Sequence, residues 1–325
     1  MRSFSYKDVS KLAKVSISTV SRYYNGGYVS KKTRGKIEKV VKEHGYYPNN
    51  GARLIKGRSR SIFTIVPETF KNAYNHIITG IEKSARNRNK KVFIIHSTPE
   101  QEDFIEIIKY CMSWKPNAIV LFLPSFDNDK IIKYIKEHVF ETTLVIYGEQ
   151  ITGLNWIDVD VENAFFSVTQ KFISYIEEGQ KLIYADDYKL SPRQKDLRFS
   201  GFRQACEKNG VLYERYLIDN KKIYEVQRFQ KYLIDNGHVN VVCSTHESFI
   251  NLVSSNDNQL RLTDIGTSSI YDTQRKYKTK IFIDYQKIGE HIEGIITEQE
   301  TKKAENNFNE PSEIVFKPMI ITQNK

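Results

Sequence analysis

The segment ISTVSRYY (17–24) combines short hydroxyl side chains with a single arginine, a set of groups that can read the edges of DNA bases. A helix over this segment would turn Val20 inward. Its outer face would then carry Ile17, Ser18, Ser21 and Arg22. Arg22 is long enough to contact guanine O6 and N7 together, while hydroxyls such as those of Ser16 and Thr19 could bind phosphates. The alternative is that these groups form only the solvated face of a small basic bundle.

The charge distribution favours a polyanionic partner for this part of the chain alone. The chain has 325 residues and a net charge of +10, but residues 1–60 hold fifteen basic residues against three acidic ones, a charge of +12. The other 265 residues hold 34 basic and 36 acidic groups, a charge of −2. A basic module is therefore joined to a nearly neutral body.

Three short helices are expected in the basic module. Ser5 with Asp8 three residues later is typical of a helix N-terminus, and the helix over 5–13 would bury Val9, Leu12 and Ala13. Ser16 can cap a second helix after a break at Lys14–Val15. A third helix is expected from Ser30 to Gly45, with Ile37, Val40 and Val41 completing a small core. Two short helices joined by a tight turn, with a supporting third, form a helix-turn-helix.

The segment from Tyr6 to Ser59 resembles the DNA-binding headpiece of the lactose-repressor (LacI/GalR) family. The resemblance is carried by Asp8-Val9, Val15-Ser16, Thr19-Val20-Ser21-Arg22, Asn25-Gly26, Val29-Ser30, Thr33-Arg34, Gly45-Tyr46 and Pro48-Asn49. It implies an all-α headpiece over 1–46 whose DNA contacts come from Ser16, Ile17, Ser18, Thr19, Ser21, Arg22 and Asn25. Two departures stand out: Lys14 replaces the usual glycine of the turn, and Tyr23-Tyr24 replace an aliphatic pair.

Residues 47–59 (YPNNGARLIKGRS) fit a hinge segment that orders on DNA. Pro48 blocks helix continuation from upstream, Gly51 weakens helicity, and Ala52–Ile55 could form one or two turns. The resemblance makes Ile55 the side chain that wedges into the minor groove, with Arg53 and Lys56 adding phosphate or minor-groove contacts. The alternative is an ordinary flexible linker.

The body, residues 60–325, alternates short apolar runs with amphipathic segments, which predicts βαβ units and parallel sheets in two lobes. Strands are expected at 61–66, 91–95, 118–123, 143–147, 156–160, 181–185, 239–243, 262–266 and 280–284. Helices are expected, among others, at 72–89, 161–178, 196–209 and 285–299. The lobe break is expected near 150–160, with the chain crossing back near 285–295.

No catalytic arrangement is evident in the body. The phosphate-binding patterns GxGxxG and GxxxxGK[ST] are absent, as are HExxH and GxSxG. Asp186–Asp187 and the alternating Asp158, Asp160 and Glu162 could suggest a metal or an acid/base pair, but carboxylates at strand ends are the simpler interpretation. The three cysteines are scattered, and no apolar run approaches the roughly 18 residues of a membrane span. We therefore expect a cytoplasmic protein without enzymatic activity, metal, cofactor or membrane partner.

The body resembles the sensor of the same family, which has the two-lobed α/β fold of periplasmic sugar-binding proteins. The resemblance runs in order through IVPETF (65–70), DVDVENA (158–164), RFSGFRQA (198–205), CSTHESF (243–249) and FIDYQKIGE (282–290). It implies an effector site built from Tyr74, Asp160, Arg193, Arg198, His246 and Ser268, with Arg198 as the strongest candidate. A guanidinium can bind two sugar hydroxyls or a phosphate. Lys189, Arg193 and Lys195 beside Arg198 make a sugar phosphate worth testing.

The resemblance therefore implies a homodimeric repressor that binds a pseudo-palindromic double-stranded DNA operator and responds to a small sugar or sugar phosphate. Two other classes stay open. One is a catabolite-control-type regulator whose body responds to a protein corepressor. The other is an α/β enzyme with a DNA-binding arm.

Overall fold

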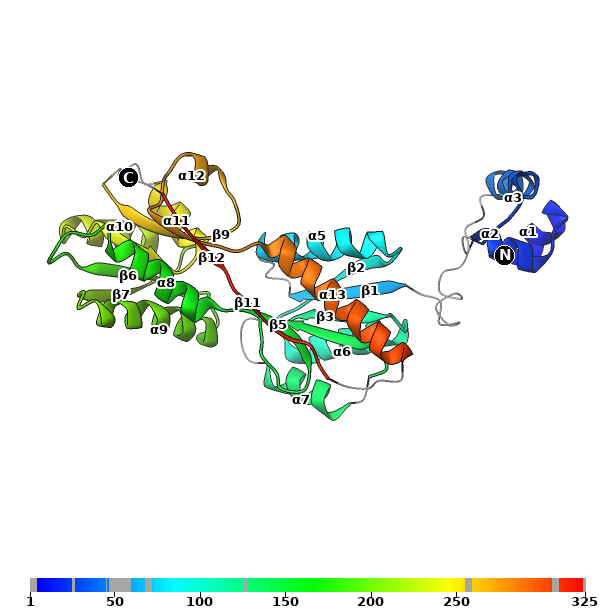
Figure 1. Ribbon diagram of the computed structural model, residues 1–325, viewed down its shortest axis with the longest axis horizontal. Helices are drawn as coiled ribbons and strands as arrows, with labels where there is room; N and C mark the ends of the chain where they lie inside the picture. The colour runs from blue at the N-terminus through cyan, green and yellow to red at the C-terminus, as the bar shows by residue number, and fades with distance from the viewer. Residues whose placement is uncertain are drawn as a thin grey trace. The chain divides into compact units, whose positions relative to one another are not determined.

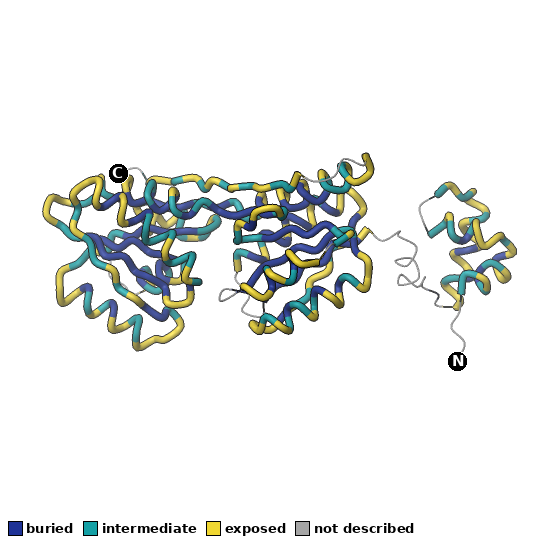
Figure 2. The backbone as a smooth tube through the Cα atoms, turned by 90° about the horizontal axis from the view of Figure 1, so that it is seen from below, coloured by how far each residue is buried: buried dark blue, intermediate teal, exposed yellow. Residues whose placement is uncertain are grey.

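The structure, a computed structural model, describes residues 5–24, 27–44, 46, 60–67, 72–124, 128–138, 140–254, 259–305 and 310–323. The chain separates into two compact units, Met1–Ser59 and Arg60–Lys325. Each unit has its own buried apolar core, drawn dark blue in Figure 2.

The first unit contains the three expected helices, α1 (Tyr6–Ala13), α2 (Ile17–Tyr24) and α3 (Lys31–His44). Their shared core consists of Val9, Ala13, Val20, Ile37, Val40 and Tyr46. The backbone N–H of Ser5 donates to the Asp8 carboxylate at 2.9 Å, so the predicted cap of α1 is confirmed. Leu12 was expected in this core but is 51% exposed, because it lies a quarter-turn beyond the inward stripe of Val9 and Ala13.

The first lobe of the second unit is built on a six-stranded parallel sheet with strand order β11-β5-β4-β3-β1-β2. Its strands are β1 (Ser61–Pro67), β2 (Lys91–Ser97), β3 (Ala118–Phe122), β4 (Thr143–Tyr147), β5 (Asn155–Val159) and β11 (Glu313–Phe316). Its helices are α5 (Asn72–Asn87), α6 (Gln101–Ser113), α7 (Asp129–Glu137) and α13 (Tyr285–Ala304). Helices α5 and α13 pack together on one face of the sheet, and α6 and α7 cover the other (Figure 1).

The second lobe repeats this arrangement around the order β12-β10-β9-β8-β6-β7, with β12 antiparallel to β10. Its strands are β6 (Leu182–Asp187), β7 (Tyr213–Ile218), β8 (Asn240–Cys243), β9 (Arg261–Gly266), β10 (Thr279–Phe282) and β12 (Met319–Thr322). Its helices are α8 (Val161–Ile173), α9 (Pro192–Lys208), α10 (Ile223–Asp235), α11 (His246–Val253) and α12 (Ile270–Thr273). Helices α8 and α9 pack on one face, and α10 and α11 on the other.

The chain passes between the two lobes three times. The first passage, from β5 to α8, lies at the expected break, and the second, from β10 to α13, lies at 283–284, just before the expected position. The third runs from β11 to β12 and was not predicted (Figure 1). These two strands are only four residues long, and β7 carries polar, partly exposed side chains, so none of the three gives a strong strand pattern in the sequence.

Two pairs of helices approach so closely that only glycine fits between them. A Cβ atom on Gly201 of α9 would lie 2.0 Å from the carbonyl oxygen of Glu162 on α8. A Cβ atom on Gly289 of α13 would lie 2.0 Å from the carbonyl oxygen of Ile77 on α5. Close packing at Gly201 sets the position of α9, and therefore of the side chains that α9 directs between the lobes.

Candidate functional site

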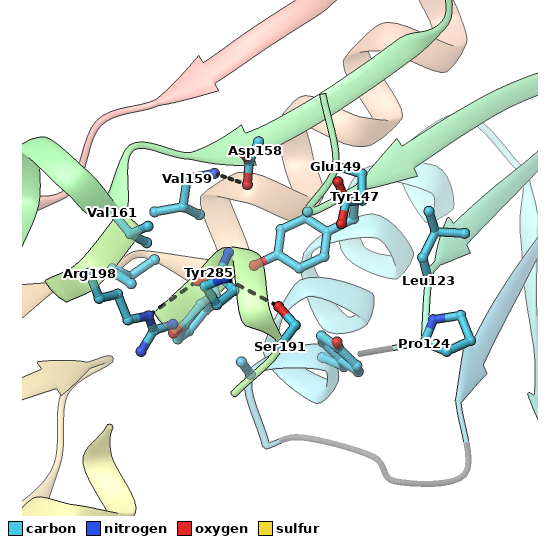
Figure 3. A pocket seen from close by; sticks show the side chains of 15 residues that line it. Leu123, Pro124, Tyr147, Glu149, Asp158, Val159, Val161, Ser191, Arg198 and Tyr285 are labelled. Atoms are coloured by element: carbon cyan, nitrogen blue, oxygen red, sulfur yellow. Dashed lines mark hydrogen bonds between the residues drawn. The ribbon is translucent and has the colours of Figure 1, made fainter. Parts of the chain in front are cut away.

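A cavity of about 130 Å³ lies between the two lobes, where strands of both sheets reach their carboxyl ends (Figure 3). Ligands of open α/β folds bind at such positions. The cavity is lined by Ala73, Tyr74, Leu123, Pro124, Tyr147, Gly148, Glu149, Asp158, Val159, Val161, Ser191, Gln194, Arg198, Ile283 and Tyr285. Apolar and aromatic walls thus surround a few polar groups, the usual composition of a small-molecule site.

Three tyrosines form the aromatic part of the lining. Tyr74 of α5 packs on Phe122 with ring centroids 4.8 Å apart and meets Tyr147 edge-on at 6.1 Å. Tyr285 begins α13 and enters from the second passage between the lobes. Burial raises the pKa of Tyr74 to about 12. Burial also raises the pKa of Tyr285 to about 12, although Arg198 opposes the rise. The phenols are therefore neutral at physiological pH, and each offers an apolar ring face together with a hydroxyl.

Arg198 is held within the second lobe by two hydrogen bonds. Its Nε donates to Oε1 of Gln194, one turn earlier on α9, at 3.1 Å. Its Nη1 donates to the backbone carbonyl of Ser244 at 2.5 Å. These bonds use part of the guanidinium fork and orient the rest of it at the cavity wall (Figure 3).

Arg193, one and a half turns earlier on α9, reaches across to the first lobe. Its Nη2 donates to Oδ2 of Asp158 on β5 at 2.6 Å, and its Nη1 donates to the carbonyl oxygen of Gly148 at 3.0 Å. Its Nε lies 3.9 Å from the Glu149 carboxylate. Burial raises the pKa of Glu149, Arg193 opposes that rise, and Asp158 adds to it. Arg193 thus joins the lobes at the rim of the cavity.

Two of the six predicted effector residues, Tyr74 and Arg198, line the cavity. Arg193 contacts lining residues without being one itself. Asp160 is directed elsewhere: its carboxylate accepts from the backbone N–H of Asn163 at 3.2 Å and so caps α8. The carboxylate at the cavity is that of Asp158, two residues earlier.

The other two predicted residues also lie outside the lining. Nδ1 of His246 is 2.7 Å from Oδ1 of Asp264, a buried carboxylate that also lies 3.0 Å from the Lys280 ammonium. This network uses His246 to join the start of α11 to the second sheet. Ser268 is exposed in the loop after β9.

Sequence reasoning missed Tyr147, Asp158, Ser191 and Tyr285 as lining residues. Tyr147 is the last residue of a predicted strand, so the rule that ligands meet strand ends could have indicated it. Ser191 and Tyr285 sit at helix starts, where polar caps are common, and only the packing of the lobes brings them together.

The carboxylates considered for metal or acid/base chemistry have structural partners. Asp186 accepts from Arg215 at 2.6 Å, and Asp187 accepts from the Thr245 hydroxyl at 2.9 Å. Within the described ranges, no three His, Cys, Asp or Glu side chains are grouped closely enough to hold a metal ion.

The first unit presents the predicted outer face of α2 to solvent. Ser16, Ser18 and Arg22 are exposed, and Ile17 is 50% exposed, while Thr19 and Ser21 are half-buried. The Ser16 hydroxyl accepts from the backbone N–H of Thr19 at 3.1 Å, which confirms its capping role. Asn25, Arg53, Ile55 and Lys56 lie outside the described residues.

Comparisons with known proteins match both units. Residues 5–49 match the model for bacterial regulatory proteins of the lacI family. Residues 59–218 match the model for periplasmic binding proteins and the sugar-binding domain of the LacI family. The chain belongs to the LacI family.

Among LacI-family relatives, catabolite control protein A of Priestia megaterium is 23% identical over 222 residues, which span 67% of this chain and 66% of that protein. The transcriptional repressor CytR of Escherichia coli is 40% identical over 107 residues, 31% of each chain. The alignments thus span less than two thirds of the length of these relatives. A crystal structure of the lac repressor dimer bound to operator and an anti-inducer has a TM-score of 0.76 at 16% identity, covering 99% of this chain and 98% of that one.

The two family matches account for the order of the two units along the chain. The chemistry of the cavity depends on the side chains that line it. The relatives named here are transcription regulators. In the described part of the chain, no helix is both long and apolar enough to cross a membrane.

Proposed function

We propose that this protein is a sequence-specific DNA-binding transcriptional regulator, a repressor of carbohydrate-utilisation genes that a small sugar-like effector controls. The observation that supports it best is the separation of two surfaces. An exposed α2 face with Arg22 lies in one compact unit, and a cavity lined by tyrosines and Arg198 lies in the other. A protein with these two surfaces can couple ligand binding to DNA binding, typically by 1–3 kcal/mol.

The DNA-binding role rests on Arg22 as the base-reading side chain. Arg22→Ala should relax base preference at one operator position by about 1–3 kcal/mol, since a bidentate contact to guanine is lost. The measurement is selection of binding sites from a random DNA library, followed by fluorescence anisotropy on single-base variants. Lys39→Ala on α3 removes an exposed cation from the same unit and is the matched control. An equal loss of affinity on all sequences would rule out the base-reading role.

The effector role rests on Arg198, which is fixed at the cavity wall from within the second lobe. Arg198→Ala should abolish the effect of the ligand on operator affinity while leaving operator binding intact. Arg203→Ala on the exposed side of α9, where Arg203 pairs with Glu207 at 3.8 Å, is the control. If Arg198→Ala instead abolished a chemical turnover, the alternative of an enzyme with a DNA-binding arm would replace this proposal.

A homodimer fits the exposed apolar side chains on one edge of the first sheet. Phe93 and Ile94 of β2 are each 48% exposed, and β2 is an edge strand. A pseudo-palindromic operator requires two headpieces related by a two-fold axis. Sedimentation analysis should show a dimer, and Ile94→Lys should shift it towards the monomer.

Control by a protein corepressor is the second candidate, favoured by the similarity to catabolite control protein A. Calorimetry with panels of sugars and sugar phosphates separates the two candidates. If the protein binds none of these compounds, the result supports control by a protein corepressor.

A further inference from the structure

We infer that the cavity takes an uncharged, hydroxyl-rich ligand, because one of the two arginines at the cavity, Arg193, is committed to a clasp between the lobes. This inference rests on the proposed function and narrows the class of its effector. The clasp is the ion pair between Arg193 and Asp158, with the Gly148 carbonyl as second acceptor.

The clasp is built from strong contacts. Asp158 is only 2% exposed, and its Oδ1 accepts from the backbone N–H of Val159 at 2.8 Å. Its Oδ2 accepts from Arg193 and from Nε2 of Gln150 at 3.1 Å. Removing Arg193 from this carboxylate would leave a buried charge uncompensated, so a ligand cannot recruit Arg193 without a large cost.

The remaining charges at the cavity do not favour an anion. Among the described residues, the lining contains one cation, Arg198, and two carboxylates, Glu149 and Asp158. Together with Arg193 these four groups sum to zero net charge when ionised. A phosphate dianion would therefore enter a site without excess positive charge, and it would meet the Glu149 carboxylate.

Lys189 and Lys195, which the sequence placed beside Arg198, also have other partners. The Lys189 ammonium lies 3.8 Å from Asp219. The Lys195 ammonium lies over the Tyr188 ring, 5.0 Å from its centroid. Neither lysine is among the residues that line the cavity.

Three of the helices that begin at the cavity are capped by side chains of the chain itself. Helix N-termini commonly bind phosphate through free backbone N–H groups. Here α8, α9 and α13 are capped by their own side-chain oxygens, from Asp160, Ser191 and Asp284. Two of these three caps are carboxylates, which repel an anion.

The groups that do face the cavity suit hydroxyls. Tyrosine rings offer apolar faces to the C–H groups of a sugar ring. The Ser191 hydroxyl, the Gln194 amide and the remaining N–H groups of Arg198 can exchange hydrogen bonds with its hydroxyls. A carboxylate such as Glu149 accepts from a sugar hydroxyl but not from a dianionic phosphate ester group, which carries no O–H.

The test is equilibrium dialysis of the full chain against labelled inorganic phosphate at low salt. Wild-type protein should bind phosphate only through the basic first unit, a background common to all variants. Asp158→Asn keeps the shape and the acceptor for Val159 but releases the Arg193 charge. It should gain one phosphate site, with an affinity at least roughly tenfold above any binding by the second unit of wild type. Adding Arg198→Gln to this variant should remove that site. Glu106→Gln, on the exposed side of α6, is the control for loss of a carboxylate.

Two results would overturn the inference. One is a wild-type site for phosphate that Arg198→Gln removes, and the other is no gain of phosphate binding in Asp158→Asn. As a second measurement, neutral monosaccharides and their phosphate esters are compared pairwise by thermal shift. A phosphate ester that stabilises the second unit more than its parent sugar would also contradict the inference. Loss of operator recognition, measured separately, would bear on the proposed function and leave the cavity result unaffected.

Discussion

Tyr24 of α2 stacks on Tyr6 of α1 in the headpiece, with ring centroids 5.5 Å apart and ring planes 9° from parallel. Tyr46 meets both rings edge-on at 6.1 Å. Tyr24, one of the two tyrosines that depart from the family pattern, therefore packs against two other tyrosines. The first unit completes its core with a tyrosine cluster where an aliphatic pair is usual.

Removing one ring of this cluster should destabilise the headpiece. Tyr24→Ala deletes a half-buried ring and its stacking contact, and we expect a loss of about 2–4 kcal/mol in the free energy of unfolding. Calorimetric melting of the full chain, following the headpiece transition, measures it. Tyr28→Ala is the control, because Tyr28 is 89% exposed, and it should change stability by less than about 0.5 kcal/mol.

The turn between α1 and α2 places Lys14 in the left-handed region, with φ of 54° and ψ of 50°. A side chain with a Cβ pays roughly 1–2 kcal/mol for this conformation. Lys14→Gly should therefore stabilise the headpiece by about 0.5–1 kcal/mol after the entropy of the unfolded glycine is offset. Lys11→Gly in the helical part of α1 should do the opposite, with a loss of about 1 kcal/mol. Equal effects at both positions would contradict this explanation of the turn.

Glu293 of α13 is a fully buried carboxylate in the first lobe. It forms ion pairs with Arg88 and with the buried Lys90, whose Nζ lies 3.1 Å from Oε1 of Glu293. It also accepts a hydrogen bond from the Ser84 hydroxyl. Glu293→Ala would leave Glu300, 2.8 Å away, as the remaining carboxylate partner of the buried Lys90 ammonium, so we expect a loss of about 1–3 kcal/mol in urea unfolding. Glu106→Ala removes an exposed carboxylate that pairs with Lys109 at 2.7 Å, and it should cost less than about 1 kcal/mol. A loss at Glu293 as small as the control would show that the pair is not stabilising.

Tyr74 should make stability depend on alkaline pH. Burial raises its pKa from 10.0 to about 12, so the folded protein holds the phenol proton more tightly than the unfolded chain does. The resulting stabilisation is complete below pH 10 and is lost as the pH rises through about 12. Tyr74→Phe removes this contribution, and its stability should fall less steeply than that of wild type over this interval. Urea unfolding at a series of alkaline pH values tests it, and parallel curves would contradict it.

Local features of the headpiece were predictable because their causes lie within a few residues. The Ser5–Asp8 cap, the Ser16 cap and the inward direction of Val20 each depend on a spacing of three or four residues along one helix. The same holds for the alternation of strands and helices in the body. Helix α9 begins four residues before its predicted start, at Ser191 and Pro192, a cap followed by the residue suited to the first helical position.

The sequence by itself determined the helix-turn-helix, the two-lobed α/β body and the candidacy of Arg198. The tertiary structure decided which side chains share the cavity, because its walls come from segments far apart in the chain. Tyr74 and Tyr285 both line the cavity although some 200 residues separate them in the sequence. Arg193 of the second lobe forms its ion pair with Asp158 of the first. Whether a basic side chain is available to a ligand depends on which acidic group lies opposite. The packing of the lobes decides which acidic group lies opposite, and the residue spacing within a single helix does not.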